Sequence, residues 1–429
     1  MLKKPTAVVL SAMLLISSIP VSASAAKMDN AESVSAPTTV AMPSDTETAS
    51  GTEQTEAATD SETEKAEETT VKNKQADPSG ALVGNDEAVC KLSFTYSVID
   101  YQVTITGLSD ESLTDLVIPE KIEDFPVTAI ASNAFSGCSN IASITVPNSV
   151  SSIGNGAFKG TNPTKVTLPF VGESRTATGS SAVFGYIFGS TYAYWSSRPA
   201  GSIFQYSNST DYWYFYYVPD TIKEVTISDT TQISENAFYN CAWIETIKVN
   251  SEIEFIGNRA FYNCSALTGF DIPEKISVLN EYLFFGCKSL ETFRFPTSLT
   301  QIGQNAFSGC SSLSETDLYI PNGVTSIGAN AFNGCSTITS IIIPNSVTMI
   351  GAGAFKGTNP TKVTLPFIGN SPTATGNSAV FGYIFGYTYA QRNSSPAGSI
   401  NQYSESTDYQ YFYLKSRLAH GVCNNEKMR

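Results

Sequence analysis

The stretch from Val324 to Ser346 decides the fold, and it reads VTSIGANAFNGCSTITSIIIPNS. Ile341 and Ile343 alternate with the residue between them, as in a β-strand with one buried face. Pro344 follows directly and ends that strand, because proline has no backbone N–H to donate to a neighbour. The second half of the stretch therefore predicts a short strand with an abrupt end.

The first half of the same stretch predicts a second extended piece and a corner. Residues 324–328 alternate as a shorter strand, and Ala331-Phe332 with Gly334 predicts a compact turn whose phenylalanine fills the interior. One such unit is too small to bury its own apolar side chains. We therefore expect many units to stack and to bury them as continuous ladders.

The same pattern recurs along the chain with a period of 23 residues. A fixed period of this length is typical of a solenoid, in which equivalent strands pair in register about 4.8 Å apart. The sequence predicts a β-rich solenoid with two aromatic-rich insertions. Full copies occupy residues 127–149, 230–252, 253–275, 276–298, 299–323 and 324–346, and partial copies begin at Val150 and Val347.

The phrase IPNGVTSIGANAFNGCSTITSIIIPNSV at residues 320–347 resembles the leucine-rich repeat of the BspA-like family of secreted and cell-surface proteins. The resemblance covers residues 108–414, and residues 94–130 are similar to the N-terminal cap of that family. It implies a right-handed leucine-rich repeat superhelix that binds proteins or cell surfaces. It implies neither catalytic residues nor a cofactor.

Two segments precede the solenoid. Lys3 and Lys4, an apolar stretch and small residues before the cleavage point predict a secretory signal peptide over residues 1–26, cleaved after Ala25 or Ala26. Residues 27–80 contain no aromatic residue and combine twelve acids with four lysines, so we expect a disordered linker. That linker is either a stalk or an inert spacer.

Two aromatic islands interrupt the repeats at residues 172–221 and 368–414. They belong to a duplicated block, because residues 147–216 and 344–413 are identical at 55 of 70 positions. Their aromatic residues form either a recognition surface or packing against the solenoid. The packing interpretation predicts that Phe184 and Phe188 on a short helix fill the core and that residues 212–217 form a strand with one buried face.

The two copies differ at selected aromatic positions. Tyr194, Trp195, Phe204 and Trp213 correspond to Gln391, Arg392, Asn401 and Gln410. Positions that tolerate such an exchange are expected to be exposed. These four aromatic residues are therefore the predicted ligand-binding residues, with the two tryptophans as the best candidates.

Six cysteines share one position of the repeat and are expected to form a column along the solenoid. Export would permit disulfides between neighbouring repeats. We favour buried free thiols, because one cysteine per repeat is typical of a packing position, and Thr161 and Thr358 occupy the same position before the islands. The members of the column are Cys138, Cys241, Cys264, Cys287, Cys310 and Cys335.

Composition argues against several classes of function. The chain has 429 residues and a net charge of −14, which disfavours nucleic-acid binding. Its single histidine, His420, makes histidine-dependent catalysis and histidine-ligated zinc unfavourable. The acids of the repeats occupy variable positions with no paired arrangement, so a carboxylate-dependent hydrolase is disfavoured as well.

These observations predict a secreted or surface-exposed, monomeric recognition protein, adhesin-like and without catalytic, cofactor or metal sites. The expected partner is an extracellular protein or a glycan, and no membrane insertion is expected after signal cleavage. The alternative is a carbohydrate-binding protein that uses the islands. The remaining predicted segments are an N-terminal cap at 81–126, repeats at 127–171 and 222–367, and a disordered tail at 415–429.

Overall fold

The computed structural model describes residues 94–110, 112–206, 212–314, 317–391, 399–404, 409–414 and 420–423. The chain divides into two units, Met1–Gly80 and Ala81–Arg429, and all described residues belong to the second. The expected signal peptide and linker lie outside the described residues.

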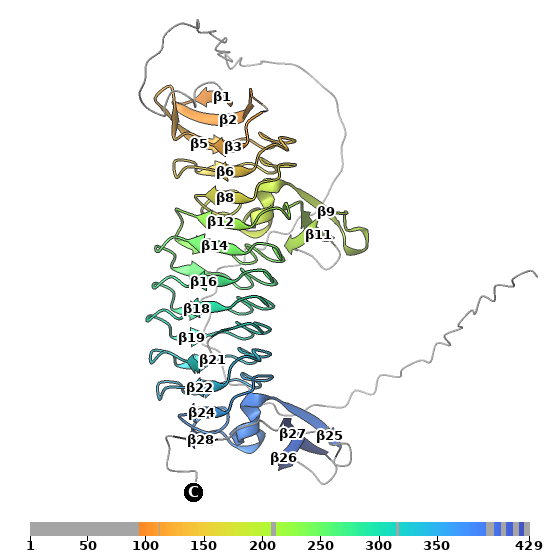
Figure 1. Ribbon diagram of the computed structural model, residues 1–429, viewed down its shortest axis with the longest axis vertical. Helices are drawn as coiled ribbons and strands as arrows, with labels where there is room; N and C mark the ends of the chain where they lie inside the picture. The colour runs from red at the N-terminus through yellow and green to blue at the C-terminus, as the bar shows by residue number, and fades with distance from the viewer. Residues whose placement is uncertain are drawn as a thin grey trace, which may run out of the picture. The chain divides into compact units, whose positions relative to one another are not determined.

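The repeats stack as a solenoid with two rows of parallel strands (Figure 1). Each row is divided into separately hydrogen-bonded groups of strands, and we call the two rows the first and the second sheet. Each repeat gives the first sheet a strand of three or four residues, as predicted from Ile341 and Ile343. The strands pair in register, so that Phe270 lies opposite Phe293. In chain order they are β3 (Asp115–Val117), β6 (Ser143–Thr145), β8 (Lys165–Leu168), β12 (Glu224–Ile227), β14 (Thr246–Val249), β16 (Gly269–Asp271), β18 (Thr292–Arg294), β20 (Asp317–Tyr319), β22 (Ser340–Ile342) and β24 (Lys362–Leu365).

The second sheet contains the predicted shorter strands. A glycine follows five of the seven strands and lies against the preceding repeat: a Cβ on Gly328 would be 2.4 Å from the backbone nitrogen of Gln304. The other two strands are followed by Ser234 and Asn280. At these five glycines a side chain would meet the backbone of the preceding repeat. The strands are β7 (Ser152–Ile153), β13 (Gln232–Ile233), β15 (Phe255–Ile256), β17 (Val278–Leu279), β19 (Gln301–Ile302), β21 (Ser326–Ile327) and β23 (Met349–Ile350).

An antiparallel hairpin covers the N-terminal end of the stack, as expected for a cap. Phe94 in this hairpin packs edge-on against Phe135 of the first full repeat, with ring centroids 6.4 Å apart. The cap consists of β1 (Phe94–Ile99) and β2 (Gln102–Leu108), followed in the sheet by β5 (Phe125–Ile130) and β4 (Lys121–Ile122).

A ladder of phenylalanines runs through the core. Consecutive rings from Phe238 to Phe355 stack with centroids 5.2 to 5.7 Å apart. Backbone bonds accompany the rings: the Phe238 amide donates to Ala260 O at 2.7 Å, and the Phe284 amide donates to Ala306 O at the same distance. Each repeat is thus fixed to the next by a buried ring and a buried hydrogen bond.

The first island does not interrupt this ladder, although the repeat pattern of the sequence stops there. The 3₁₀ helix η4 (Phe184–Phe188) takes the place of a corner, with Phe158 donating to Ile187 O and Phe184 donating to Ala237 O, both at 2.8 Å. The predicted core role of Phe184 and Phe188 is confirmed, since both are fully buried. Strand β8 pairs directly with β12, so the island is an excursion from one repeat.

The second island repeats this arrangement. In η7 (Phe381–Phe385), Phe385 lies 6.3 Å from Phe355 and 5.1 Å from Phe381 between ring centroids. Both islands project from the same side of the stack (Figure 1). The second island further contains η6 (Gly376–Ala379), β25 (Tyr387–Gln391), β26 (Ser399–Ser404) and β27 (Tyr409–Leu414).

The end of the described chain differs from the expected disordered tail. Residues His420–Cys423 form β28, which pairs in parallel with β24. Four residues of the expected tail therefore occupy the next strand position of the first sheet. Residues 415–419 and 424–429 lie outside the described residues.

The cysteine column consists of free thiols. Five of its members are buried and Cys138 is half-buried. The Cys264 thiol donates to Phe238 O at 3.2 Å, whereas Thr161 donates to the carbonyl of Phe158 in its own repeat at 2.8 Å. The favoured interpretation of a packing position is thereby confirmed.

These buried thiols are expected to be unreactive in the native protein. The thiolate is the nucleophile, and burial raises the pKa of Cys335 to about 12. Titration with a coloured thiol reagent at neutral pH should miss the five buried cysteines until a denaturant is added. Their absence from the count in unfolded, unreduced protein would instead demonstrate disulfides.

Replacing Phe284 with alanine tests the ladder. Its ring is fully buried between Phe261 and Phe307, so the change should lower the free energy of unfolding by about 3–5 kcal/mol. The control is Phe255→Ala on the second sheet, where the ring is 50% exposed, and its effect should stay near about 0.5 kcal/mol. Equal losses in denaturant titrations of the two variants would contradict the ladder's role.

Candidate functional site

The first island forms a small antiparallel sheet of strands β10 (Ile203–Tyr206), β11 (Tyr212–Tyr216) and β9 (Ser190–Tyr194), in that order. The prediction of a strand at 212–217 is confirmed, but the simple alternation is not. Phe215 and Tyr216 are consecutive and both fully buried, so β11 is buried on both faces at this end. The Tyr216 hydroxyl donates to Ser180 O at 2.7 Å near η3 (Gly179–Ser181).

A buried glutamine attaches the island to the next repeat. Gln205 accepts a hydrogen bond from the Gly185 amide at 2.7 Å through Oε1. Its Nε2 donates to Tyr239 O at 3.2 Å and to Cys241 Sγ at 3.3 Å. Because the amide is 1% exposed, these contacts satisfy it fully and fix strand β10 beside the repeat at 230–252.

The four predicted ligand-binding residues lie in different surroundings. Tyr194 ends β9 and is 50% exposed, as expected, and Trp195 begins the 3₁₀ helix η5 (Trp195–Ser197). Phe204 and Trp213 are only half-buried and pack edge to face, with centroids 4.7 Å apart. Their exposure is therefore smaller than the differences between the two copies suggest.

Phe204 continues into an aromatic row that the prediction missed. Its ring lies 5.4 Å from that of Tyr239, which stacks on Tyr262 at 4.5 Å, and Tyr262 stacks on Phe285 at 4.7 Å. All three repeat residues are half-buried on the outside of the corners. We call Trp213, Phe204, Tyr239, Tyr262 and Phe285 the aromatic ridge.

A sequence signal for the ridge exists. Each of these three repeat residues directly follows the buried phenylalanine of its corner, and the same position elsewhere holds Ser136, Lys159, Ser308, Asn333 or Lys356. The aromatic residues are confined to the three repeats after the first island. Because the other repeats fold with polar residues at this position, the fold itself does not require these aromatic residues.

Two strained residues lie next to the ridge. Every corner needs a residue with positive φ, and most repeats use asparagine or glycine there. Arg259 and Tyr282 occupy it with φ of 56° and 57°, a conformation that costs a residue with a Cβ about 1–2 kcal/mol. The Arg259 guanidinium lies 5.1 Å from the centre of the Tyr282 ring. Such strain at a surface favours a functional role.

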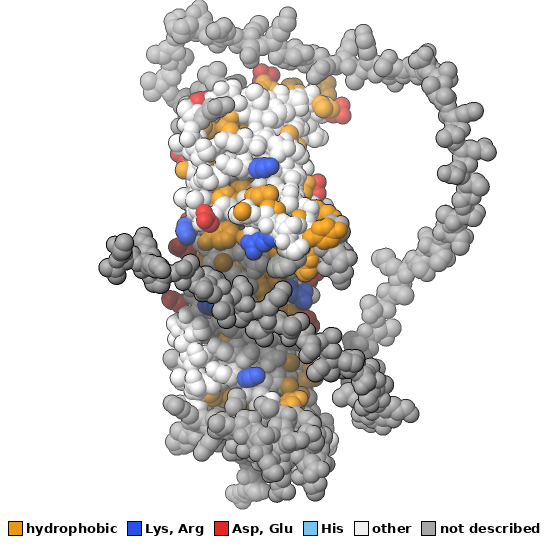
Figure 2. Space-filling model, turned by 90° about the vertical axis from the view of Figure 1, so that its right-hand side faces the viewer, with side chains coloured by type: hydrophobic (Ala, Val, Ile, Leu, Met, Phe, Trp, Pro, Cys, Tyr) orange, Lys and Arg blue, Asp and Glu red, His pale blue; other side chains and the backbone are white. Residues whose placement is uncertain are grey.

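A groove of about 470 Å³ runs between the first island and the corners of these repeats. Phe204 and Ile203 of β10 line one side, while Asn240, Asn263 and Trp243 line the other. Two cations, Arg198 and Lys288, also line it. Figure 2 shows hydrophobic side chains gathered at mid-height on the side from which the islands project, with isolated Lys and Arg side chains nearby.

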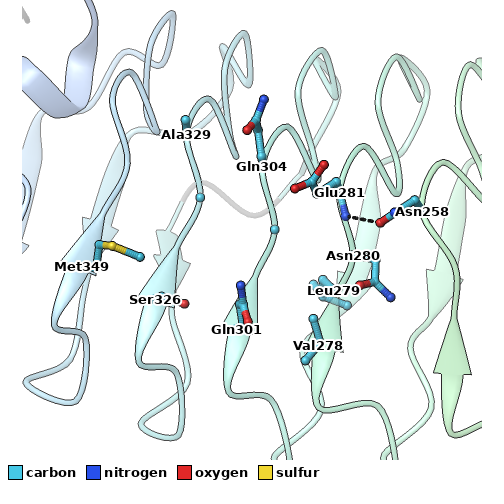
Figure 3. A pocket seen from close by; sticks show the side chains of 12 residues that line it. Asn258, Val278, Leu279, Asn280, Glu281, Gln301, Gln304, Ser326, Ala329 and Met349 are labelled. Atoms are coloured by element: carbon cyan, nitrogen blue, oxygen red, sulfur yellow. Dashed lines mark hydrogen bonds between the residues drawn. The ribbon is translucent and has the colours of Figure 1, made fainter. Parts of the chain in front are cut away.

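A second groove of about 490 Å³ follows the shorter strands and is shown in Figure 3. Its labelled residues include Gln301, Gln304, Ser326 and Met349, which come from successive repeats. The Glu281 amide donates to Asn258 Oδ1 at 3.1 Å across its edge. The lining lacks aromatic residues and strained backbone, so the groove beside the ridge is the stronger candidate site.

The outward face of the first sheet carries cross-strand ion pairs. Glu224 accepts from Lys248 at 3.0 Å and lies 3.5 Å from Lys165. The hydrogen bond from Lys248 lowers the pKa of the Glu224 carboxyl below its usual value. Exposed pairs of this kind contribute little free energy, and this face of mixed charge shows no site.

The described residues contain neither a metal-binding cluster nor a membrane-spanning helix. Among them, no three His, Cys, Asp or Glu side chains come together as a metal site would require. In the same part of the chain, no helix has the length and apolar character needed to cross a membrane.

Replacing Tyr282 with asparagine tests the strain. The change should relieve about 1 kcal/mol of backbone energy, so the free energy of unfolding should stay constant or rise despite the lost ring contacts. Denaturant titration measures it, with Asn305→Tyr as the reciprocal variant that should lose stability. A large loss of stability for Tyr282→Asn would instead show that the Tyr282 side chain serves only to pack against its neighbours.

Comparisons with known proteins agree with this architecture. The family model described as "BspA type Leucine rich repeat region" matches six copies, over residues 108–184, 209–318 and 314–381. No curated protein matches the chain.

Several solved structures are similar to this chain. A leucine-rich repeat protein from Bacteroides ovatus is 23% identical, with 67% of this chain and 74% of that chain covered and a TM-score of 0.38. A leucine rich cell surface protein from Faecalibacterium prausnitzii is 16% identical, with 71% and 98% covered and a TM-score of 0.22. A leucine-rich repeat protein from Eubacterium ventriosum is 18% identical, with 68% and 98% covered and a TM-score of 0.31.

Proposed function

Because the chain belongs to the BspA-type leucine-rich repeat family, we propose that it is an extracellular or surface-exposed recognition protein, adhesin-like and without catalytic activity. The aromatic ridge is the single observation that carries this proposal. It combines large half-exposed aromatic residues with a groove and with Arg259 and Tyr282 at corner positions where most repeats have asparagine or glycine.

The ridge has the composition expected of a protein-binding surface. Tyrosine and tryptophan are enriched at binding hot spots, because they bury a large area while fixing few torsions. Here the stack of Tyr239, Tyr262 and Phe285 is held rigid by its neighbours before any ligand arrives. Such preorganisation lowers the entropic cost of binding.

The secretory signal predicted at residues 1–26 and the cell-surface relative from Faecalibacterium prausnitzii support the extracellular location. A solenoid that displays its variable residues outward suits that setting, since its side offers an extended surface for contact. We propose that the protein acts there as a monomer.

A triple variant tests the proposal. Tyr239, Tyr262 and Phe285 are changed to serine, the residue that two other repeats carry at this position. Binding to an immobilised panel of extracellular proteins should fall at least about tenfold, because the hot-spot rings are removed. Circular dichroism and melting confirm that the variant remains folded.

Phe255→Ser is the matched control, since it removes a 50% exposed ring from the second sheet and leaves the ridge intact. It should bind like the unmodified chain. Unchanged binding by the folded triple variant, or an equal loss in the control, would contradict the proposed site.

Carbohydrate binding through the islands is the second candidate. Tyr192 and Tyr194 are 48% and 50% exposed and lie on one face of β9, where side chains two residues apart point the same way. Exposed rings of this kind can stack on sugars. A glycan array separates this candidate from the ridge. Glycan binding is compared between the variant Tyr192→Ala/Tyr194→Ala and the variant Trp195→Ala/Trp213→Ala.

A further inference from the structure

The groove beside the ridge has a charge opposite to that of the chain as a whole. The chain carries 39 acids against 25 basic residues, yet the groove is lined by Arg198 and Lys288 and by no acid. The Lys288 ammonium makes no ion pair or side-chain hydrogen bond within the described residues. The Arg198 guanidinium donates to Ser202 O and keeps its charge.

The second island differs at this point. The position equivalent to Arg198 is Ser395, and Phe204 and Trp213 are replaced by Asn401 and Gln410. Both the cation and the ring contacts are thus specific to the first island. Three of the 15 differences between the two copies, at Arg198, Phe204 and Trp213, therefore fall at the groove or the ridge.

The polar groups of the groove include an acceptor, Asn263 Oδ1, that accepts no hydrogen bond within the described residues. Asn240 Nδ2 donates to Phe204 O at 3.2 Å, and Asn263 Nδ2 donates to Asn240 Oδ1 at 3.1 Å. Asn263 Oδ1 ends this chain of amides. A backbone N–H of a bound peptide would satisfy it.

The geometry of the ridge rings beside this groove favours a peptide over a sugar. Tyr239, Tyr262 and Phe285 lie face to face, with interplanar angles of 1° and 7°. Stacking covers both faces of the Tyr262 ring and one face each of Tyr239 and Phe285, whereas a sugar packs its C–H groups on an open face. Ring edges carry partial positive charge, which suits carboxylates and carbonyl oxygens.

We infer that the groove between the first island and the aromatic ridge binds an extended acidic peptide segment of a partner protein. A carboxylate lies between Arg198 and Lys288, an apolar side chain packs against Phe204 and Trp243, and a backbone N–H donates to Asn263. This inference rests on the proposed recognition function, for which it supplies the chemistry of the partner.

Intrinsic fluorescence of the full chain tests it directly. The chain has three tryptophans, Trp195, Trp213 and Trp243, which all lie in the first island or the repeat after it. The probes are a short synthetic peptide that alternates glutamate with leucine, its twin with lysine for glutamate, and oligogalacturonate. The glutamate peptide should change the emission saturably and bind more weakly as salt is added.

Charge variants locate the binding. Lys288→Gln and the double variant Arg198→Gln/Lys288→Gln should weaken the glutamate peptide, the latter at least about tenfold. Lys362→Gln is the matched control, because it removes one exposed positive charge from strand β24. It should bind the peptide unchanged.

Three outcomes of the peptide measurements would overturn the inference. These are no saturable change with the glutamate peptide, equal binding of the lysine twin, or unchanged affinity in folded Lys288→Gln and the double variant. Binding of oligogalacturonate without the glutamate peptide would assign the groove to an acidic glycan and overturn it too. Any of these results, combined with partner binding that still depends on the ridge, would leave the proposed recognition function standing.

Discussion

The contact between one repeat and the next is the constraint on which the rest of the structure depends. A buried phenylalanine stacks on its equivalent in the next repeat, and the amide of that residue donates to the neighbouring corner. Neither contact exists within a single repeat, so stability grows only as repeats are added. The glycines after five of the seven short strands and the thiol column both follow from this close spacing.

The islands show how the constraint accommodates a long insertion. Helix η4 supplies Phe184 and Phe188 at successive places in the ladder and keeps the backbone bonds on both sides. The remainder of the island then projects outward without breaking the core. Gln205 and the packing of Phe204 on Tyr239 hold it beside the next repeat, which creates a groove that the plain repeats lack.

The repeats could be predicted from the sequence because period and residue type agree: the strand at Ile341 and the corner at Phe332 both lie where the pattern puts them. The continuation of the ladder through the island could not be predicted, because the segment from Phe184 to Phe188 lacks the repeat pattern. Its place in the ladder depends on 3₁₀ geometry. Half-burial of Phe204 arises from Tyr239 in another repeat, a contact that comparison of the two island copies does not reveal.

Continuity of the ladder through the first island is the central claim, because the site exists only if η4 holds the island in the stack. Hydrogen exchange resolved at single amides tests it most directly. The amides of Phe158 and Phe184 should be protected as strongly as those of Phe238 and Phe284 in the plain repeats. Rapid exchange at Phe158 and Phe184, with slow exchange in the repeats on both sides, would contradict it.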